Sequence, residues 1–290
     1  MGENPHVAWR MQIARQIAQR LQRYEGIQAI VVGGSVARGY ADAYSDLEMP
    51  LFWDVLPSDE QRLQIVADLG AEFLYGYDGP ANEDQVLIEG FQVDFWHCTV
   101  AGEEEVLEDV LTRLDTDLGS SNFFDTLRSC IPLYGETIIL RWKERARCYP
   151  DALATKNLQE SLDRLYRGHP EAHAARDNPT MVYGTIGGLQ QEVFHILLAL
   201  NREYFPSYKW MYRALERTVV VPRDVGQRFR QAYVLPRDEA IRDTVAIVAE
   251  TLDLVELHMP QVDTKRARKR FSVPQRVYEI SVKLWSEDNS

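Results

Sequence analysis

The sequence is poor in cysteine and lacks the spacing motifs of disulfide frameworks and zinc sites. Its three cysteines, Cys98, Cys130 and Cys148, are an odd number and no pair has Cys-x-x-Cys spacing, which argues against a set of disulfides and a cysteine zinc site. The six histidines are dispersed without a His-Glu-x-x-His motif, which disfavours a transition-metal site. We therefore expect a cytoplasmic protein in a reducing environment.

Long hydrophobic runs are also lacking. The longest, FHILLAL at residues 194–200, is much shorter than the roughly 20 residues that cross a bilayer as a helix. The first residues, MGENPHVAWRMQIARQ, contain no apolar stretch of the kind found in secretory signals. The sequence thus predicts no membrane partner.

Positive charge is scarce relative to negative charge. Lys and Arg total 32 against 44 Asp and Glu, for a formal net charge of −12, which disfavours a broad phosphate-binding surface for nucleic acid. A cationic small substrate is compatible with this balance. Residues 265–270, KRARKR, are the local exception. A solvated helix end explains them better than a polyanion contact.

The length and hydrophobic pattern predict two domains. The 290 residues are 45% hydrophobic and 26% charged, and such a chain is long for a single core. Apolar spacing is mixed helix and strand in the first half and almost wholly helical from Asp151 onward, up to a last helical run at residues 277–285. Pro132, Gly135 and Pro150 interrupt the pattern between the halves. We place the domains at residues 1–148 and 149–290.

The first half contains a series of short elements that end in chemically distinctive residues. A helix is expected near residues 7–21, before a strand at 27–32. A second strand is expected at 46–53, followed by a helix at 58–70 with Ser58 and Gln61 as a capping box. Two strands, at 85–90 and 91–98, join near Gly90, and further helices are expected near 103–118 and 121–131.

Two features of this half indicate phosphate and metal chemistry. Gly33-Gly34-Ser35 follows a strand directly, so its backbone N–H groups can approach phosphate oxygens closely. Asp46 and Glu48, two residues apart on the next strand, point to one face. Asp94 is out of place in an apolar strand unless it has a partner. Carboxylates and phosphates are the ligands that Mg²⁺ prefers, so the pattern predicts phosphoryl or nucleotidyl transfer.

At these residues the chain resembles the nucleotidyltransferase superfamily typified by DNA polymerase β, and in particular the aminoglycoside and lincosamide nucleotidyltransferases and related uncharacterised bacterial members. The resemblance rests on VVGGSVARGYADAYSDLE and on VDFW further along the chain, and it covers about residues 27–98. It implies an α+β fold, in which a small mixed-sheet nucleotidyltransferase domain precedes an all-helical C-terminal domain that binds substrate or nucleotide.

The resemblance also assigns roles to residues. It implies that Gly34 and Ser35 hold the triphosphate of an NTP, with Arg38 also reaching a phosphate. It implies that Asp46, Glu48 and Asp94 bind Mg²⁺, two ions in all, and act in catalysis. A weaker resemblance of NREYFPSYKWMYRALE implies that Lys209 binds the nucleotide. From the sequence alone, the apolar stripe around Lys209 is equally consistent with a helix that packs in a core.

The expected reaction transfers an NMP from an NTP to a hydroxyl group of a small molecule, such as an aminoglycoside or lincosamide antibiotic, with release of pyrophosphate. Glu48 departs from the family, which more often has Asp there. This departure keeps open the alternative of a catalytically degenerate protein that binds nucleotides or a protein partner. A tRNA- or protein-modifying nucleotidyltransferase is a separate alternative. Either Asp94 or Glu89 is the general base. The sequence does not predict the oligomeric state.

Several other residues have two interpretations. Asp42 is more typical of a turn stabiliser than of a ligand. His97 and His195 lie in apolar runs and are expected to be packed histidines. The acids of the helical half that are candidates for binding an amine-bearing acceptor are Glu192, Glu203 and Glu216.

Overall fold

The computed structural model describes residues 4–79, 82–273 and 276–278. Its contacts divide the chain into two compact units. The first comprises Met1–Leu153 together with Arg202–Ser207, and the second comprises Ala154–Asn201 and Tyr208–Ser290. The expected boundary, after residue 148, lies shortly before this division. The return of Arg202–Ser207 to the first unit has no signal in the sequence pattern.

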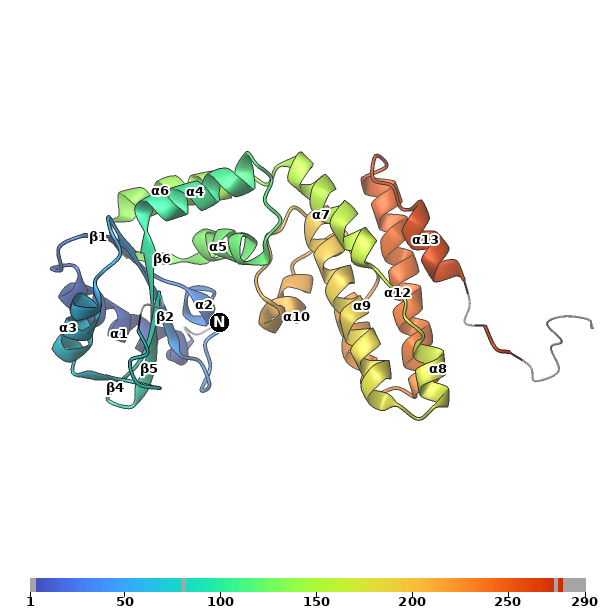
Figure 1. Cartoon of the computed structure of the whole chain (residues 1–290), viewed down its shortest axis with the longest axis horizontal. Coiled ribbons are helices and arrows are strands. Elements are labelled where there is room, and N and C mark those ends of the chain that lie inside the picture. Colours follow the sequence, from blue (N-terminus) through green and yellow to red (C-terminus); the bar gives the residue numbers. More distant parts are fainter. Residues whose placement is uncertain (1–3, 80–81, 274–275, 279–290) are drawn as a thin grey trace, which may run out of the picture. The chain divides into compact units, whose positions relative to one another are not determined.

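The first unit is a mixed sheet with helices on both faces (Figure 1). Its strands are β1 (Ile27–Val32), β2 (Leu47–Trp53), β3 (Ala71–Phe73), β4 (Glu83–Ile88), β5 (Phe91–Thr99) and β6 (Ile131–Tyr134). Its helices are α1 (Pro5–Leu21), α2 (Gly34–Ala37), α3 (Asp59–Leu69), α4 (Val100–Leu111), α5 (Leu118–Ser129) and α6 (Glu136–Ala146).

The sheet has the order β3-β4-β5-β2-β1-β6. β2 and β5 are parallel, whereas the other neighbouring pairs are antiparallel. The mixed sheet followed by a helical unit confirms the α+β class expected from the sequence. The parallel pair places the start of β2 beside β5 in the middle of the sheet, which brings the acids of two distant segments together.

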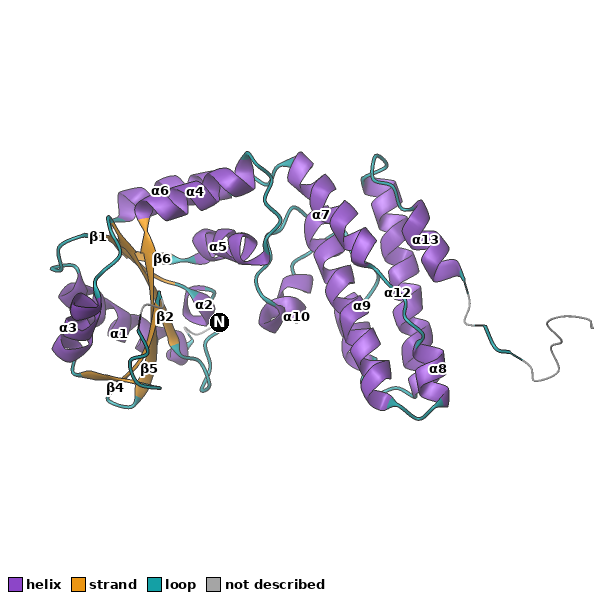
Figure 2. Ribbon diagram, in the orientation of Figure 1, coloured by secondary structure: helices purple, strands orange, loops and turns teal. Residues whose placement is uncertain are grey.

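Alternation along the strands separates two cores. Leu47, Met49 and Leu51 of β2 pack with α1 and α3 on one face. Phe52 of β2 and Val31 of β1 pack with α4, α5 and α6 on the other, as the helices flanking the strands in Figure 2 show. Glu48 belongs to this second face, since successive residues of a strand point to opposite sides.

Local signals explain several elements. Ser58 and Gln61 form the expected capping box at the start of α3, and Glu89 and Gly90, both with positive φ, form the turn of the β4–β5 hairpin. Two expected boundaries were wrong: α4 ends at Leu111, and α5 begins at Leu118 after an Asp117 cap. The interrupted region contains β6 and α6, neither of which was expected from the sequence. β6 contains Pro132, and proline is tolerated at the edge of a sheet, where β6 lies.

The second unit consists of helices. They are most of α7 (Asp151–Arg164), α8 (Pro170–Ala175), α9 (Pro179–Leu200), the 3₁₀ helix η1 (Tyr208–Trp210), α10 (Met211–Leu215), α11 (Val225–Gln231), α12 (Arg237–His258) and α13 (Lys265–Ser272). The apolar run 194–200 is in α9, and no described helix is long and apolar enough to cross a membrane. The helical run expected at 277–285 falls outside the described residues after Tyr278.

Candidate active site

The glycine-serine loop lies directly against Glu48. Gly34 has φ of 58°, and a Cβ placed there would lie 2.6 Å from the Glu48 carboxyl carbon and 2.7 Å from both of its oxygens. The Gly33 N–H donates to the Glu48 carbonyl oxygen at 3.0 Å. Glycine is therefore needed at position 34 both for the left-handed backbone and for the carboxylate beside it.

The three acids lie near the N-terminal ends of the two central strands, β2 and β5. Glu48 and Asp94 are opposite each other in the parallel β2–β5 pair, and Asp46 directly precedes β2. Asp94 is 6% exposed. Its pKa is raised to about 6, because burial penalises the charged form; the negative charges of Asp46, Glu83 and Glu48 add to the rise, while a 3.0 Å hydrogen bond from Gln92 opposes it. Such a cluster of like charges is stabilised by a bound cation.

Ser35 carries a second indication of a ligand. It is 7% exposed, and its Oγ has no hydrogen-bond partner among the described residues. A buried hydroxyl group without a partner costs free energy, so such groups in folded proteins usually meet a protein atom, a water molecule or a ligand. Ser35 follows Gly34, so this unsatisfied oxygen belongs to the same loop as the backbone that faces Glu48.

The carboxylates of Asp46, Glu48 and Asp94 are ligands of the kind that Mg²⁺ binds. Within the described ranges, no group of three or more His, Cys, Asp or Glu side chains is arranged to hold a metal ion by itself. Mg²⁺ is commonly held by one or two carboxylates together with substrate phosphates and water. Asp46 and Glu48 offer oxygen ligands of this kind beside the loop, with Asp94 next to them.

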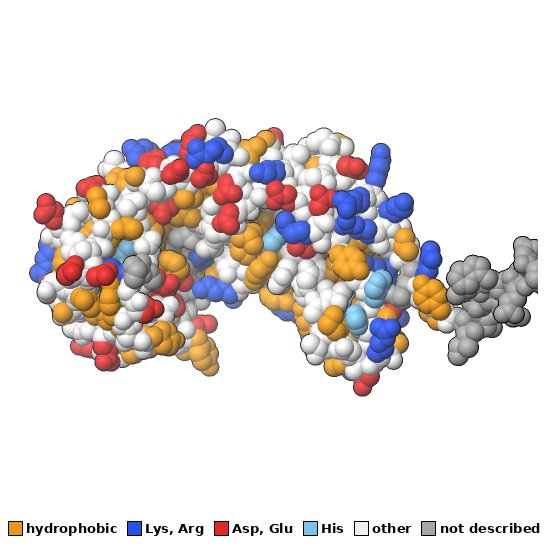
Figure 3. Space-filling view, viewed as in Figure 1, with side chains coloured by type: hydrophobic (Ala, Val, Ile, Leu, Met, Phe, Trp, Pro, Cys, Tyr) orange, Lys and Arg blue, Asp and Glu red, His pale blue; other side chains and the backbone are white. Residues whose placement is uncertain are grey.

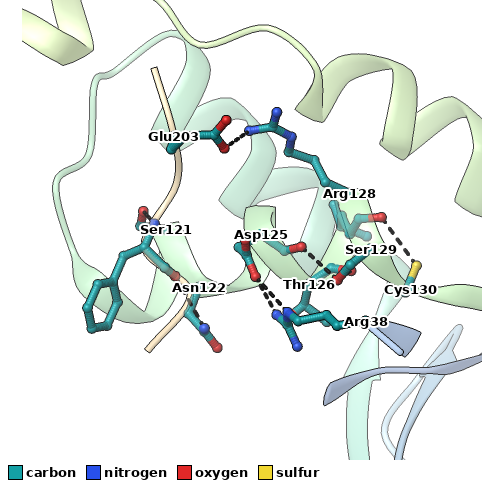
Figure 4. A network of polar contacts seen from close by, with 11 residues as sticks. Arg38, Ser121, Asn122, Asp125, Thr126, Arg128, Ser129, Cys130 and Glu203 are labelled. Carbon is teal, nitrogen blue, oxygen red and sulfur yellow. Dashed lines mark hydrogen bonds and ion pairs between the residues drawn. The ribbon is translucent and has the colours of Figure 1, made fainter. Parts of the chain in front are cut away.

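Arg38 has a structural partner. Its guanidinium forms an ion pair with Asp125 of α5, including a 3.2 Å hydrogen bond from Nε, and the two side chains are 5% and 14% exposed. This pair ties the end of α2 to α5 (Figure 4). The sequence offers no signal for it, because 87 positions separate the partners. That Arg38 binds a phosphate stays a prediction.

Residues 202–207, which belong to the first unit, also contact α5. Ser121 Oγ accepts from the Phe205 N–H at 2.9 Å, Asn122 donates to the Phe205 carbonyl at 3.3 Å, and Arg128 pairs with Glu203 at 3.0 Å. Figure 4 shows these contacts around α5. The helix is thus anchored from two directions, beside the loop.

Arg10 positions the acid-bearing segment and was missed by sequence reasoning. It is 3% exposed in α1 and donates from Nε to the Ser45 carbonyl at 3.0 Å, directly before Asp46. An arginine within the apolar stripe of a helix was the available signal. Asp42 accepts from the Tyr44 N–H at 2.9 Å and from Ser45 Oγ at 3.1 Å, so it stabilises the turn, as its more typical role predicts.

The remaining candidates lie elsewhere in the structure. Lys209 is exposed in η1 of the second unit, with its Nζ 5.8 Å from the centre of the Trp210 ring; its nucleotide role stays a prediction. Glu89 is exposed at the hairpin turn and lines a cavity with α1. His97 is buried between Trp53 and Asp84, with ring nitrogens 3.2 and 2.8 Å from their polar atoms.

The acids proposed for amine recognition have arginine partners. Glu192 pairs with Arg164 at 3.2 Å and Glu216 with Arg213 at 3.4 Å, while Glu203 pairs with Arg128. These contacts reduce the charge that an amine would meet. His195 is 2.9 Å from the Tyr208 hydroxyl, and burial lowers its pKa to about 4.

The basic run forms α13, and Figure 3 shows Lys and Arg side chains gathered over this part of the second unit. Its arginines have partners: Arg268 pairs with Asp253 and Glu256 at 2.5 Å, Arg266 lies 3.7 Å from Asp163, and Arg270 donates to the Asp163 carbonyl at 2.9 Å. These contacts support the interpretation of a solvated helix end.

Comparisons with known proteins add little to this geometry. A family model described as a domain of unknown function, DUF4037, matches residues 133–211, less than a third of the chain. No curated protein matches. A solved structure, that of a nucleotidyltransferase-like protein from Exiguobacterium sibiricum 255-15, is similar at 11% identity with a TM-score of 0.41, over 85% of this chain and 76% of that one. The function is therefore inferred from the site itself.

Proposed function

We propose that the protein is a magnesium-dependent nucleotidyltransferase that moves an NMP from an NTP to a hydroxyl group of a small molecule. The observation that carries the proposal is the juxtaposition of Glu48 with both the Gly34 backbone and Asp94. One carboxylate thus adjoins a loop able to receive phosphates and a second, buried carboxylate. The unsatisfied Ser35 hydroxyl supports a ligand at this loop.

In the proposed reaction, the acceptor oxygen forms a bond to the α-phosphorus, the bond between that phosphorus and the α,β-bridging oxygen breaks, and pyrophosphate leaves. The loop at Gly34 and Ser35 orients the phosphates. Asp46 and Glu48 would hold Mg²⁺, with Asp94 beside them. When bound, Mg²⁺ would neutralise phosphate charge and favour ionisation of the acceptor hydroxyl. Asp94, the buried carboxyl group opposite Glu48, accepts the hydroxyl proton.

Asp46→Asn tests the metal site. We expect it to lower transfer by at least about 10³-fold, because an amide cannot replace a charged metal ligand, while far-UV circular dichroism and the melting temperature stay close to those of the unmodified protein. Asp54→Asn, an exposed acid just beyond the other end of β2, is the control and should keep full activity. The assay uses each labelled NTP with Mg²⁺ and a panel of hydroxyl compounds. Near-normal turnover by Asp46→Asn would refute the mechanism.

Calorimetry separates an enzyme from a degenerate relative that binds only a protein partner. A nonhydrolysable NTP should bind in a Mg²⁺-dependent manner, and Asp46→Asn should reduce the Mg²⁺ dependence. If no NTP binds with or without Mg²⁺, the interaction-protein alternative left open by Glu48 replaces the proposal.

A further inference from the structure

A cavity of about 450 Å³ opens on the same sheet face as the acids, wholly within the first unit. Its floor is formed by β1, β2 and β5 and its walls by α4 and α5. The lining includes Glu48, so the cavity adjoins the proposed metal site. Its apolar lining residues include Val31, Pro50, Phe52, Trp96, Phe123 and Leu127. We refer to it as the Trp96 cavity.

The parallel pairing of β2 and β5 arranges this face in rows. Glu48 is opposite Asp94, Pro50 is opposite Trp96, and Phe52 is opposite Cys98. Residues two apart on a strand are separated by about 6.6 Å. A ring that packs on the Pro50–Trp96 row therefore lies about 6.6 Å from the row that contains Glu48 and Asp94. A hydroxyl group on that ring can point toward these two acids.

Trp96 is unusual for this position. It is 44% exposed, although its strand lies inside the sheet and Asp94, two residues earlier on the same face, is only 6% exposed. An exposed indole at the mouth of a cavity is a surface on which a flat ring can stack. Volumes of about 300–1,000 Å³ with an apolar lining and few polar groups are typical of small-molecule sites.

The lining has few charged groups with which a polycation could pair. Glu48 and Glu103 are its charged residues, and no Lys, Arg or His lines it among the described residues. Glu48 is engaged in the proposed metal site. Burial raises the pKa of Glu103, which also contacts Cys98, and Glu103 is the one remaining acid among the described lining residues, whereas an aminoglycoside carries several ammonium groups. The lining matches a neutral molecule better than an aminoglycoside.

We propose that the Trp96 cavity is the acceptor subsite and takes a neutral, largely apolar ring compound that carries a hydroxyl group. The assignment rests on the proposed nucleotidyl transfer, in which that hydroxyl oxygen attacks the α-phosphorus, its proton passes to Asp94 and pyrophosphate leaves. It narrows the acceptor from hydroxyl compounds in general to aromatic or alicyclic alcohols.

The test uses 1-naphthol as the probe and isothermal calorimetry on the full chain. We expect one site. Val106→Phe, which adds bulk to the α4 wall, should weaken binding by at least about tenfold, because extra atoms in a filled cavity displace the ligand. Val55→Phe, the same change at a residue that is 77% exposed outside the cavity, should leave the affinity unchanged. Ser120→Leu fills the cavity from α5 and replaces Val106→Phe if that variant melts early.

The outcomes distinguish failure of the acceptor subsite from failure of the proposed nucleotidyl transfer. Binding of a nonhydrolysable NTP with Mg²⁺ should be the same in Val106→Phe and the unmodified protein, and NTP and naphthol should bind together. No naphthol binding, or equal binding by all variants, would overturn the subsite while leaving NTP binding intact. Competition between naphthol and the NTP would assign the cavity to the nucleobase. An affinity for naphthol that falls as protein concentration rises would assign it to a second copy of the chain. Either result overturns the proposal.

Discussion

Gly34 is the residue at which backbone geometry and the proposed chemistry coincide. Alanine there would combine left-handed strain, about 1–2 kcal/mol, with a Cβ 2.6 Å from the Glu48 carboxyl carbon. We expect Gly34→Ala to weaken NTP binding by at least about tenfold and to lower the free energy of unfolding by about 1–3 kcal/mol more than its control.

The control is Gly39→Ala in the same loop. Gly39 also has a positive φ, 76°, but no neighbouring atom lies within 4 Å of the place that an alanine Cβ would occupy there, so this variant carries the strain without the collision. Urea unfolding and calorimetry with the NTP measure both quantities. Equal effects of the two substitutions would show that the contact with Glu48 is unimportant.

His195 predicts a pH dependence at the residue scale. Burial lowers its pKa from 6.5 to about 4, so the unfolded chain binds a proton between these values and the folded chain does not. The free energy of unfolding should therefore fall as pH falls from 6.5 toward 4, by up to about 3 kcal/mol. His195→Gln should lose this part of the dependence in urea titrations at several pH values. His258→Gln, at the exposed end of α12, should retain it. Parallel pH curves for the two variants would contradict the prediction.

At the scale of elements, α5 joins the loop, the returning segment and the wall of the Trp96 cavity. Its link to α2 is the Arg38–Asp125 pair, whose side chains are 5% and 14% exposed. Removing one partner of a buried pair typically costs about 3–5 kcal/mol. Arg38→Ala and Asp125→Ala should each be strongly destabilising, and the double variant should cost clearly less than their sum in urea unfolding.

The exposed Arg147–Glu144 pair of α6, at 73% and 71%, is the matched control and should change stability by no more than about 1 kcal/mol. Arg38→Ala and Asp125→Ala also test whether Arg38 binds a phosphate. If Arg38 also binds the nucleotide, Arg38→Ala weakens NTP binding more than Asp125→Ala does. Equal losses of affinity would leave Arg38 with its structural role alone.

At the scale of the whole molecule, charge argues for a small acceptor. The net charge is −12, and the arginines of α13 are engaged by Asp163, Asp253 and Glu256. We expect no saturable tRNA binding below about 100 µM at physiological salt. Replacing Arg266, Arg268 and Arg270 by Ala should lower stability rather than RNA affinity, as filter binding and thermal unfolding would show. Tight, salt-sensitive binding lost in that triple variant would instead favour an RNA acceptor.

The sequence predicted the local elements that have strong signals. Apolar runs indicated β1, β2 and the strands of the β4–β5 hairpin, and the capping box indicated α3. It did not predict β6, because four residues with a proline become a strand only by pairing with β1. It also placed the start of α5 too late, since the preceding helix was expected to continue to residue 118 and so covered the Asp117 cap.

By itself, the sequence determined which residue types are present and how they are spaced: a Gly-Ser loop after a strand, two carboxylates two residues apart at the start of a strand and an acid in an apolar strand. Those features depend on backbone geometry and on neighbours within a few positions. The tertiary structure decided which of them meet. The parallel pairing of β2 with β5 set Glu48 opposite Asp94, the buried Arg38–Asp125 pair bound α5 to the loop, and the packing of α4 and α5 left a cavity beside the acids. These contacts join residues tens of positions apart, and only the packing of the whole unit selects them.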